Sequence, residues 1–191
     1  MTTTTPPTVS LLPLSAEDHA DALQQVYRAT PAYWQQFGLP GAPAGQARRD
    51  LEDAAATAGR SLMGIVQPAA DAPGVELVGL VDFRLHWPEP GIVYVGMVLV
   101  AGPYQRLGIG RAAWALLRPW LAGPAGMLLA RTAVEQFNPG ALRFFQALGF
   151  SLTGSSSRMQ RGARWVRLLY LEQQLGIALP ASPSPEPSTV A

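Results

Sequence analysis

A turn containing two glycines joins the strongest strand pattern of this chain to its strongest helix pattern. Apolar, mostly β-branched residues fill Ile92–Val100, and Gly108 and Gly110 follow in the next turn. Apolar residues then recur at i, i+3, i+4, i+7 and i+8 over Ile109–Leu121, which predicts a helix with one buried face. A strand is predicted next at Met127–Ala133. The segment is therefore a β-α-β unit, and the sheet that contains it should be mixed.

The other segments predict further strands, several of them joined as hairpins. Strands are expected at Val9–Leu14, Ser61–Gln67, Val75–His86, Phe150–Arg158 and Arg164–Glu172. Helices are expected after the N-cap Ser15, over Gln46–Ala58 and after the N-cap Asn138. We therefore expect an α/β (α+β) fold: one domain over residues 9–175, with a mixed, mostly antiparallel sheet of about seven strands flanked by about four helices. Residues 1–8 and the Pro/Ser-rich residues 176–191 are expected to be disordered.

Composition excludes several classes of chemistry. The chain has no cysteine and no lysine, which excludes disulfides, thiolate catalysis, a lysine-dependent P-loop and a Schiff-base enzyme. Its only histidines are His19 and His86, so a multi-histidine metal site is excluded and no metal is expected. A net charge of +1 gives no electrostatic reason to bind nucleic acid or a membrane surface. The N-terminus does not resemble a signal peptide, and no apolar run has the length of a membrane span. We expect a cytoplasmic protein, and the many Ala, Pro, Gly and Arg residues hint at a bacterial one.

The turn Gln105–Arg111 is suited to hold an anion. Its glycines allow a tight backbone that approaches a ligand closely, and the first amides and the dipole of the following helix attract negative charge. Taken alone, a Gly-x-Gly between strand and helix is more often only a tight turn.

Two sequence blocks narrow the interpretation. The first is Gln105-Arg-Leu-Gly108-Ile-Gly110, and the second is Asn138-Pro-Gly-Ala141-Leu-Arg-Phe144-Phe145-Gln-Ala-Leu148-Gly149-Phe150. They resemble the two blocks of the GNAT superfamily of acyl-CoA-dependent N-acetyltransferases, Gln/Arg-x-x-Gly-x-Gly/Ala and Asn-x-x-Ala-x-x-Phe-Tyr-x-x-Leu-Gly-Phe. The resemblance is specific over Val75–Leu171, and the N-terminal third matches only in the order of its elements.

The resemblance implies acetyl-CoA as cosubstrate and assigns residues to it. The backbone groups of Val98, Leu99 and Val100 would hydrogen-bond the pantetheine arm. Gln105 belongs to the signature, and the pyrophosphate would be held by the amides of Arg106, Leu107, Gly108, Ile109, Gly110 and Arg111. An amide cradle needs no lysine. Asn138 would reach the pantetheine amide, or it serves as a plain N-cap, or both.

Phe145 departs from the family pattern. Family members commonly have a tyrosine at this position, which protonates the departing thiolate of CoA. Phenylalanine has no proton to give, so the usual acid is missing and Phe145 is expected only to pack against the coenzyme.

The general base is not given by a motif. If the turn Trp87–Gly91 pairs His86 with Ile92, Arg84 lies opposite Tyr94 and Asp82 lies opposite Gly96. Asp82, Arg84, His86 and Tyr94 then share one sheet face, with Gly96 leaving space beside the Asp82 carboxylate. Asp82 is accordingly a candidate base with Tyr94 beside it, or it forms a simple surface pair with Arg84. Glu135 is a second candidate base, or a solvated loop acid.

Three functions follow from these features. The first is transfer of an acetyl group from acetyl-CoA to a primary amine of a small molecule or peptide, by a monomer or homodimer. The second is a catalytically idle acyl-CoA sensor of the same fold, which Phe145 keeps open. The third is a dinucleotide-binding oxidoreductase, disfavoured because its glycines follow a late strand and no acid stands about 20 residues downstream.

Overall fold

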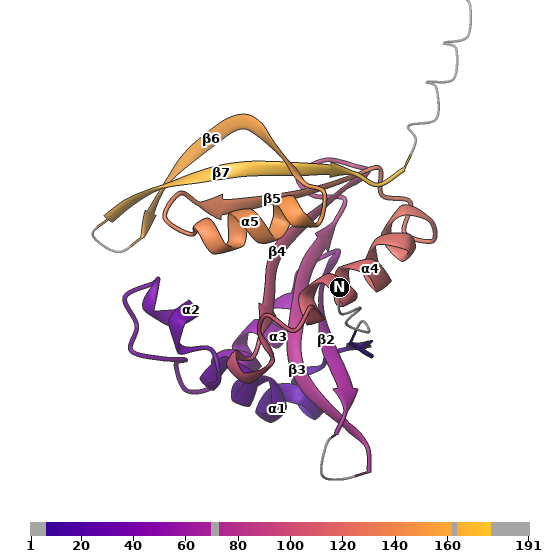
Figure 1. The fold of residues 1–191 in the computed structure, drawn as a ribbon, viewed down its shortest axis with the longest axis vertical. Coiled ribbons are helices and arrows are strands. Elements are labelled where there is room, and N and C mark those ends of the chain that lie inside the picture. The colour runs from indigo at the N-terminus through magenta and orange to yellow at the C-terminus, as the bar shows by residue number, and fades with distance from the viewer. Residues whose placement is uncertain (1–6, 70–72, 162–163, 177–191) are drawn as a thin grey trace, which may run out of the picture.

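The computed structural model describes residues 7–69, 73–161 and 164–176, which form one seven-stranded sheet (Figure 1). The strands lie in the order β1-β2-β3-β4-β5-β7-β6. Their bounds are β1 Ser10–Pro13, β2 Arg60–Pro68, β3 Val75–Leu85, β4 Ile92–Val100, β5 Leu129–Glu135, β6 Ser151–Arg161 and β7 Arg164–Gln174. Neighbouring strands are antiparallel except β4 and β5, which are parallel. The mixed, mostly antiparallel sheet expected from the sequence is confirmed.

Four helices of nine residues or more flank the sheet in the described part of the chain. They are α1 Ala16–Arg28, α3 Gln46–Ala56, α4 Ile109–Ala122 and α5 Pro139–Ala147; a short helix α2, Pro31–Gln35, and a 3-10 turn η1, Gly102–Tyr104, complete the helical elements. The cap expected for α1 is present, since the Ser15 hydroxyl accepts a hydrogen bond of 3.2 Å from the amide of Asp18. None of the helices that the structure describes could cross a membrane.

The two faces of the sheet bury separate apolar cores. On one face, α4 and α5 pack against a cluster that includes Val81, Val93 and Val95, and we call this the α4/α5 face. On the other, α1 and α3 pack against Leu62 and Leu80, and we call this the α1/α3 face. Among the described residues, the second core takes members from β2, β3 and β4 and none from β5, β6 or β7. The β5-β7-β6 half of the α1/α3 face therefore lies outside that core.

Most element bounds agree with the sequence expectation to within two residues, and those of β4 coincide with it. β5 begins two residues late because the preceding amides bond elsewhere: that of Met127 donates to Leu121, and that of Leu128 donates to Gly91. The disorder expected for residues 1–8 and 176–191 concerns segments that, apart from Pro7, Thr8 and Gly176, lie outside the described residues.

The parallel strands β4 and β5 separate halfway along their length. Their pairing covers only Ile92–Val95 of β4 and Leu129–Thr132 of β5. Beyond Val95, β4 remains paired with β3 through Met97–Val100, while β5 remains paired with β7 as far as Glu135. One edge of Gly96–Val100 therefore faces a gap in the sheet, which we call the β4–β5 gap.

Candidate functional site

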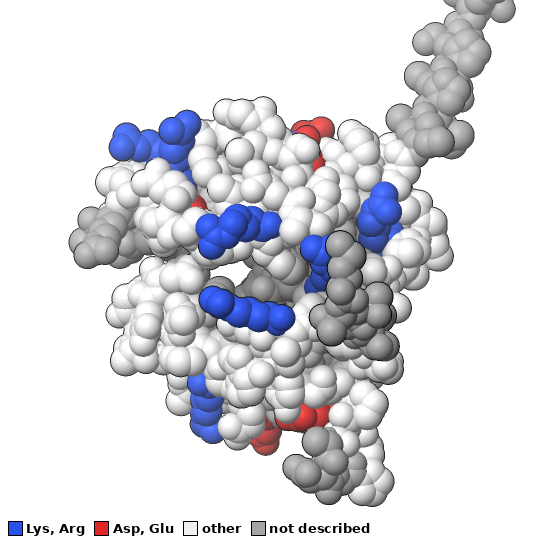
Figure 2. Space-filling view, viewed as in Figure 1, with Lys and Arg blue, Asp and Glu red and all other residues white. Residues whose placement is uncertain are grey.

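A pocket of about 430 Å³ lies between the end of β4, the start of α4 and the start of α5, and we call it the loop pocket. Ten of the twelve residues that the resemblance assigns to the coenzyme line it: Val98, Leu99, Val100, Gln105, Arg106, Gly108, Ile109, Gly110, Arg111 and Phe145. Leu107 and Asn138 do not line it. Figure 2 shows a hollow near the centre of the molecule with basic side chains on both rims, which gives this side a positive character.

The start of α4 presents backbone donors to the loop pocket. The first bond within the helix runs from the amide of Ala112 to the carbonyl of Gly108, at 2.9 Å. The amides of Ile109, Gly110 and Arg111 precede it and have no carbonyl one turn earlier in the helix. Gly108 is the N-cap with a φ of +83°, a left-handed conformation that favours glycine. These donors and the helix dipole fit a phosphate group.

Gly110 is required by packing as well as by the turn. A Cβ added at Gly110 would lie 3.1 Å from two ring carbons of Phe144 in α5. The glycine therefore lets α4 approach α5 closely, with Phe144 forming a wall of the loop pocket. Close approach of the backbone to a ligand is the reason expected from the sequence for the glycines of this turn, and the structure adds contact between two helices as a reason for Gly110.

The end of β4 offers its backbone to the β4–β5 gap at alternate residues. The Leu99 carbonyl is directed toward Gly79 of β3, so it is engaged on the opposite edge. The backbone N–H and C=O groups of successive strand residues point to opposite edges, so those of Val98 and Val100 point to the gap. The side-chain amide of Gln105 donates 2.8 Å to the Val100 carbonyl, which ties the glycine turn to the strand end. Of the three residues expected to meet the pantetheine arm, Leu99 is thus the least available.

Asn138 joins two parts of the fold instead of lining the loop pocket. Its Oδ1 accepts a 3.0 Å hydrogen bond from the amide of Ala141, which caps α5. Its Nδ2 donates 3.1 Å to Oε1 of Gln36, which follows α2. The N-cap expectation is met, and the bond to Gln36 links the α2 segment to α5. Sequence reasoning missed this contact because its partners are 102 positions apart.

Phe145 is buried among other rings. Its side chain is 6% exposed, and its ring centroid lies 5.3 Å from those of Phe144 and Phe150. It lines the loop pocket with its carbon surface only. Phe145 therefore packs against its neighbours, and its side chain cannot donate a proton.

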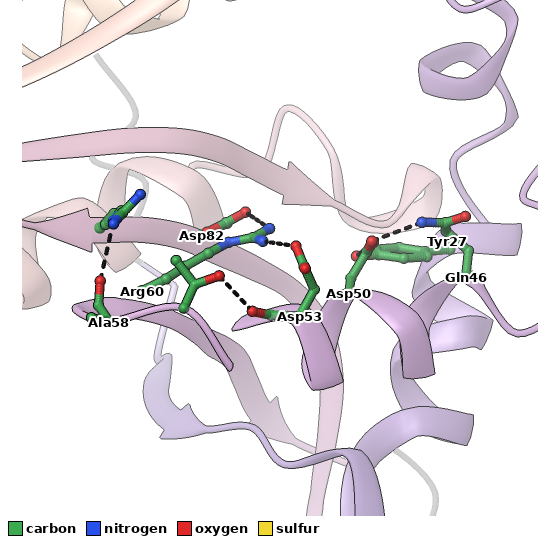
Figure 3. A network of polar contacts seen from close by, with 9 residues as sticks. Tyr27, Gln46, Asp50, Asp53, Ala58, Arg60 and Asp82 are labelled. Atoms are coloured by element: carbon green, nitrogen blue, oxygen red, sulfur yellow. Dashed lines mark hydrogen bonds and ion pairs between the residues drawn. The ribbon is translucent and has the colours of Figure 1, made fainter. Parts of the chain in front are cut away.

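Asp82 is held by Arg60 and not by Arg84 (Figure 3). The Arg60 guanidinium donates to both carboxylate oxygens of Asp82, at 3.1 and 2.8 Å, and to Asp53 of α3 at 2.7 Å. The hydrogen bond with Asp82 raises the pKa of Arg60 above its ordinary value. The alternative that Asp82 forms a simple surface pair with Arg84 is therefore wrong; Arg84 donates to the Ala58 carbonyl and lies over the Trp87 ring.

A β-bulge corrects the expected register of the β3–β4 hairpin. Arg84 pairs with Tyr94 as expected, but Asp82 pairs with Met97 because Gly96 is an extra residue on β4. The expected space beside the carboxylate is nevertheless present, since a Cβ at Gly96 would lie 3.6 Å from Oδ2 of Asp82. His86 lies outside β3, with a φ of +53° and its Nδ1 accepting from the Gly91 amide.

Tyr94 and Glu135 lie on the α1/α3 face near the β4–β5 gap. Their neighbours Val93, Val95 and Val134 belong to the α4/α5 core, so alternation along the strands directs Tyr94 and Glu135 to the opposite face. Burial raises the pKa of Tyr94, and the nearby Tyr170 and Glu135 raise it further while Arg131 lowers it. Glu135 is thus within electrostatic reach of Tyr94, and it is the last residue of β5.

The loop pocket also includes residues that the sequence reasoning did not assign to it: Tyr104, Gly140, Ala141 and Phe144. Ala141 and Phe144 belong to the second sequence block, so their position in the motif was an available signal. No sequence motif pointed to Tyr104, because this residue is brought to the pocket by the 3-10 turn η1.

Comparisons with solved structures agree with this geometry. The acetyltransferase of Thermus thermophilus is 26% identical, with a TM-score of 0.68 over 88% of this chain and 97% of that one. The ribosomal-protein alanine N-acetyltransferase of Escherichia coli is 14% identical, with a TM-score of 0.66 over 92% and 99%. The GNAT-family acetyltransferase of Streptococcus pneumoniae is 14% identical, with a TM-score of 0.61 over 88% and 100%. The last two likenesses concern the fold alone.

Sequence comparison gives the family itself. No curated protein sequence matches the chain. Residues 24–150, which hold both sequence blocks, the β4–β5 gap and the start of α4, match the acetyltransferase (GNAT) family. The chain belongs to the acetyltransferase (GNAT) family.

Proposed function

We propose that this protein transfers an acetyl group from acetyl-CoA to a primary amine of a small molecule or peptide. The observation that carries the proposal is the convergence of the α4 amides, the open edge of β4 and the apolar wall of α5 on one pocket. The amides of Ile109, Gly110 and Arg111 would bind the pyrophosphate, and the backbone of Val98 and Val100 would align the pantetheine arm in the gap. Acetyl-CoA, when bound, supplies an acetyl group activated as a thioester.

The chemistry requires a neutral amine and an acceptor for its proton. The amine nitrogen forms a bond to the acetyl carbon, the carbon–sulfur bond breaks, and the amine loses a proton. We assign that proton to Glu135, directly or through water, because Glu135 ends β5 at the β4–β5 gap. Asp82 is the weaker candidate because both of its carboxylate oxygens already accept hydrogen bonds from Arg60. The thiolate takes its proton from solvent, since Phe145 has none to give.

Coenzyme binding is tested by titration calorimetry with acetyl-CoA, with NAD as the control ligand. We expect acetyl-CoA to bind and NAD not to bind. Arg111→Ala should weaken acetyl-CoA binding about 10-fold through the loss of one charged partner. Arg118→Ala removes an exposed arginine further along α4, outside the loop pocket, and should leave the affinity unchanged. Binding of NAD in place of acetyl-CoA would refute the proposal.

Turnover is tested by thiol release from acetyl-CoA with a panel of primary amines. Glu135→Gln should lower turnover about 10²–10⁴-fold, the usual effect of losing a general base. Asp82→Asn should instead lower the free energy of unfolding by about 1–3 kcal/mol, through its weakened bonds to Arg60, with turnover nearly unchanged. The reverse pattern would transfer the role to Asp82. Acetyl-CoA binding with no thiol release for any amine would favour the sensor.

A further inference from the structure

A second pocket, of about 510 Å³, lies on the α1/α3 face, and we call it the sheet-face pocket. Three aromatic side chains, Trp87, Tyr94 and Tyr170, line it together with an ion pair, Arg131 and Glu172. These residues come from the β3–β4 turn and from β4, β5 and β7, which are adjacent in the sheet. None of them lines the loop pocket.

The sheet-face pocket lies close to the start of the β4–β5 gap, because Tyr94 and Arg131 are one residue before the end of the β4–β5 pairing. Two residues beyond Tyr94 on β4 is Gly96, and two residues beyond Arg131 on β5 is Ala133. Alternation puts Ala133 and Glu135 on the same face as Arg131, so on β5 only the small side chain of Ala133 stands between Arg131 and Glu135. A step of two residues along a strand is about 7 Å, so a short molecule can reach from the pocket to the gap.

The ion pair makes the sheet-face pocket electrically neutral. Nε of Arg131 donates 2.6 Å to Oε1 of Glu172, and Nη2 lies 2.6 Å from the same oxygen. Both side chains are only about a quarter exposed, at 25% and 28%. A cationic ligand group would be repelled by Arg131, and an anionic group would be repelled by Glu172. The attraction of a charged group to one member of the pair is therefore offset by its repulsion from the other. A neutral ligand group is therefore favoured.

The aromatic side chains present ring surface to that ligand group. The rings of Trp87 and Tyr94 are 4.8 Å apart at 87°, an edge-to-face pair, and Trp87 is 39% exposed. The Tyr170 hydroxyl lies 3.0 Å from the Ser157 hydroxyl, which fixes the third ring. A further ring can extend such an edge-to-face arrangement. Burial raises the pKa of Tyr94, so its phenol remains a neutral hydrogen-bond donor.

Resting on the acetyl transfer proposed above, we propose that the acceptor is a primary amine carrying a neutral aromatic ring, with the ring held between Trp87, Tyr94 and Tyr170 and the nitrogen in the β4–β5 gap. The spacing of about 7 Å corresponds to a short alkyl chain between ring and nitrogen. Polyamines and amino acids with a charged distal end are poor acceptors on the same argument.

The experiment compares matched amines in the thiol-release assay. Phenethylamine is the probe, and cyclohexylethylamine is its saturated counterpart. Cadaverine and β-alanine carry a distal cation and a distal anion. We expect kcat/KM for phenethylamine to exceed that of each of the others about 10-fold or more, because ring–ring contacts and an undisturbed ion pair both favour it. Equal or higher values for cyclohexylethylamine, cadaverine or β-alanine would overturn the inference.

Substitutions in the sheet-face pocket test which residues confer the preference for an aromatic amine. Trp87→Ala should reduce the preference for phenethylamine over cyclohexylethylamine about 10-fold without changing the KM for acetyl-CoA. Trp165→Ala removes a tryptophan that is 63% exposed and lines a different pocket, so it should leave both values unchanged. Arg131→Gln leaves Glu172 without its cation and should raise kcat/KM for cadaverine relative to phenethylamine about 10-fold. Melting temperatures verify that each variant is folded.

The outcomes separate this inference from the proposed function. Failure to bind acetyl-CoA, measured without any amine, would refute the acetyl transfer and with it the acceptor class. Acetyl-CoA binding with transfer to amines other than phenethylamine would refute the acceptor class alone. A preference for phenethylamine that survives Trp87→Ala would show that the ring binds elsewhere, which also refutes the inference.

Discussion

Replacement of Gly110 by valine tests whether packing between α4 and α5 shapes the coenzyme pocket. The new Cβ would stand 3.1 Å from two carbons of the Phe144 ring and 3.8 Å from a methyl group of Val100. Carbon atoms in contact prefer about 3.5–4.0 Å, so the ring must move by roughly half an ångström for the Cβ alone. The two further methyl groups of valine extend the overlap. Since Phe144 lines the loop pocket, its displacement alters the pocket itself.

The expected loss of stability in Gly110→Val follows from the free-energy cost of overpacking. Extra methyl groups in a well-packed contact cost about 1–3 kcal/mol. For a chain of this length, each kcal/mol corresponds to a change of about 2–4 °C in the melting temperature. Gly110→Val should therefore lower the melting temperature by about 2–12 °C. Acetyl-CoA affinity should fall at least about 10-fold, because the Phe144 wall and the first α4 amides are displaced together.

A second substitution identifies the cause. Phe144→Leu in the Gly110→Val background removes the ring that the valine meets, so it should restore part of the melting temperature. The coupling energy from the four proteins of this double-mutant cycle measures the contact. Calorimetry with acetyl-CoA on the same four proteins measures affinity. A Gly110→Val protein with parental stability and lost affinity, without coupling to Phe144, would refute the packing argument and favour direct occupation of the ligand space.

Three further perturbations test separate parts of the site. Phe145→Leu should lower the free energy of unfolding by about 1 kcal/mol without moving the pH profile of turnover, and a shifted alkaline limb would contradict this. Gln36→Ala removes the bond to Asn138 but keeps the α5 cap, so it should lower the free energy of unfolding by about 1 kcal/mol or less, a smaller loss than for Asn138→Ala, which removes both bonds; equal losses in denaturant unfolding of the two variants would contradict this. Burial raises the pKa of Tyr94, so above pH about 10 the unfolded chain releases this proton while the folded chain keeps it, and stability falls with rising pH. Tyr94→Phe should reduce that fall by up to about 1.4 kcal/mol per pH unit, measured by denaturant unfolding between pH 8 and 11; an unchanged slope would contradict it.

Local sequence signals predicted the backbone geometry around the loop pocket. The bounds of β4, the cap at Ser15 and the cap at Asn138 each depend on residues within a few positions. The glycine turn is also local, since Gly108 needs its left-handed backbone to start the helix that follows it. Such features are decided by backbone geometry and periodicity, which a single sequence displays directly.

The partner of Asp82 could not be predicted in the same way. Arg84 is two residues away on the same strand face, which made it the natural candidate, but Arg60 arrives from β2, 22 positions earlier. Choosing between them required the β2–β3 register and the position of α3, from which Asp53 also binds Arg60. The bulge at Gly96 had a signal, because glycine inside a strand often marks one. Its effect on Asp82 still depended on the pairing of the whole hairpin.

The loop pocket and the sheet-face pocket therefore differ in how sequence change affects them. The loop pocket depends on a turn and two helix starts, where a single change such as Gly110→Val is expected to disturb packing and binding together. In the sheet-face pocket, Tyr94, Arg131 and Tyr170 each come from a different strand, with Glu172 on the same strand as Tyr170, and their side chains project from a sheet whose hydrogen bonds are made by the backbone. A side chain there can be exchanged without moving the strands or the start of α4. Acceptor specificity can consequently change while coenzyme binding is retained. If the acceptor binds as proposed above, the residues of the sheet-face pocket, and not the family motif, determine which amine is acetylated.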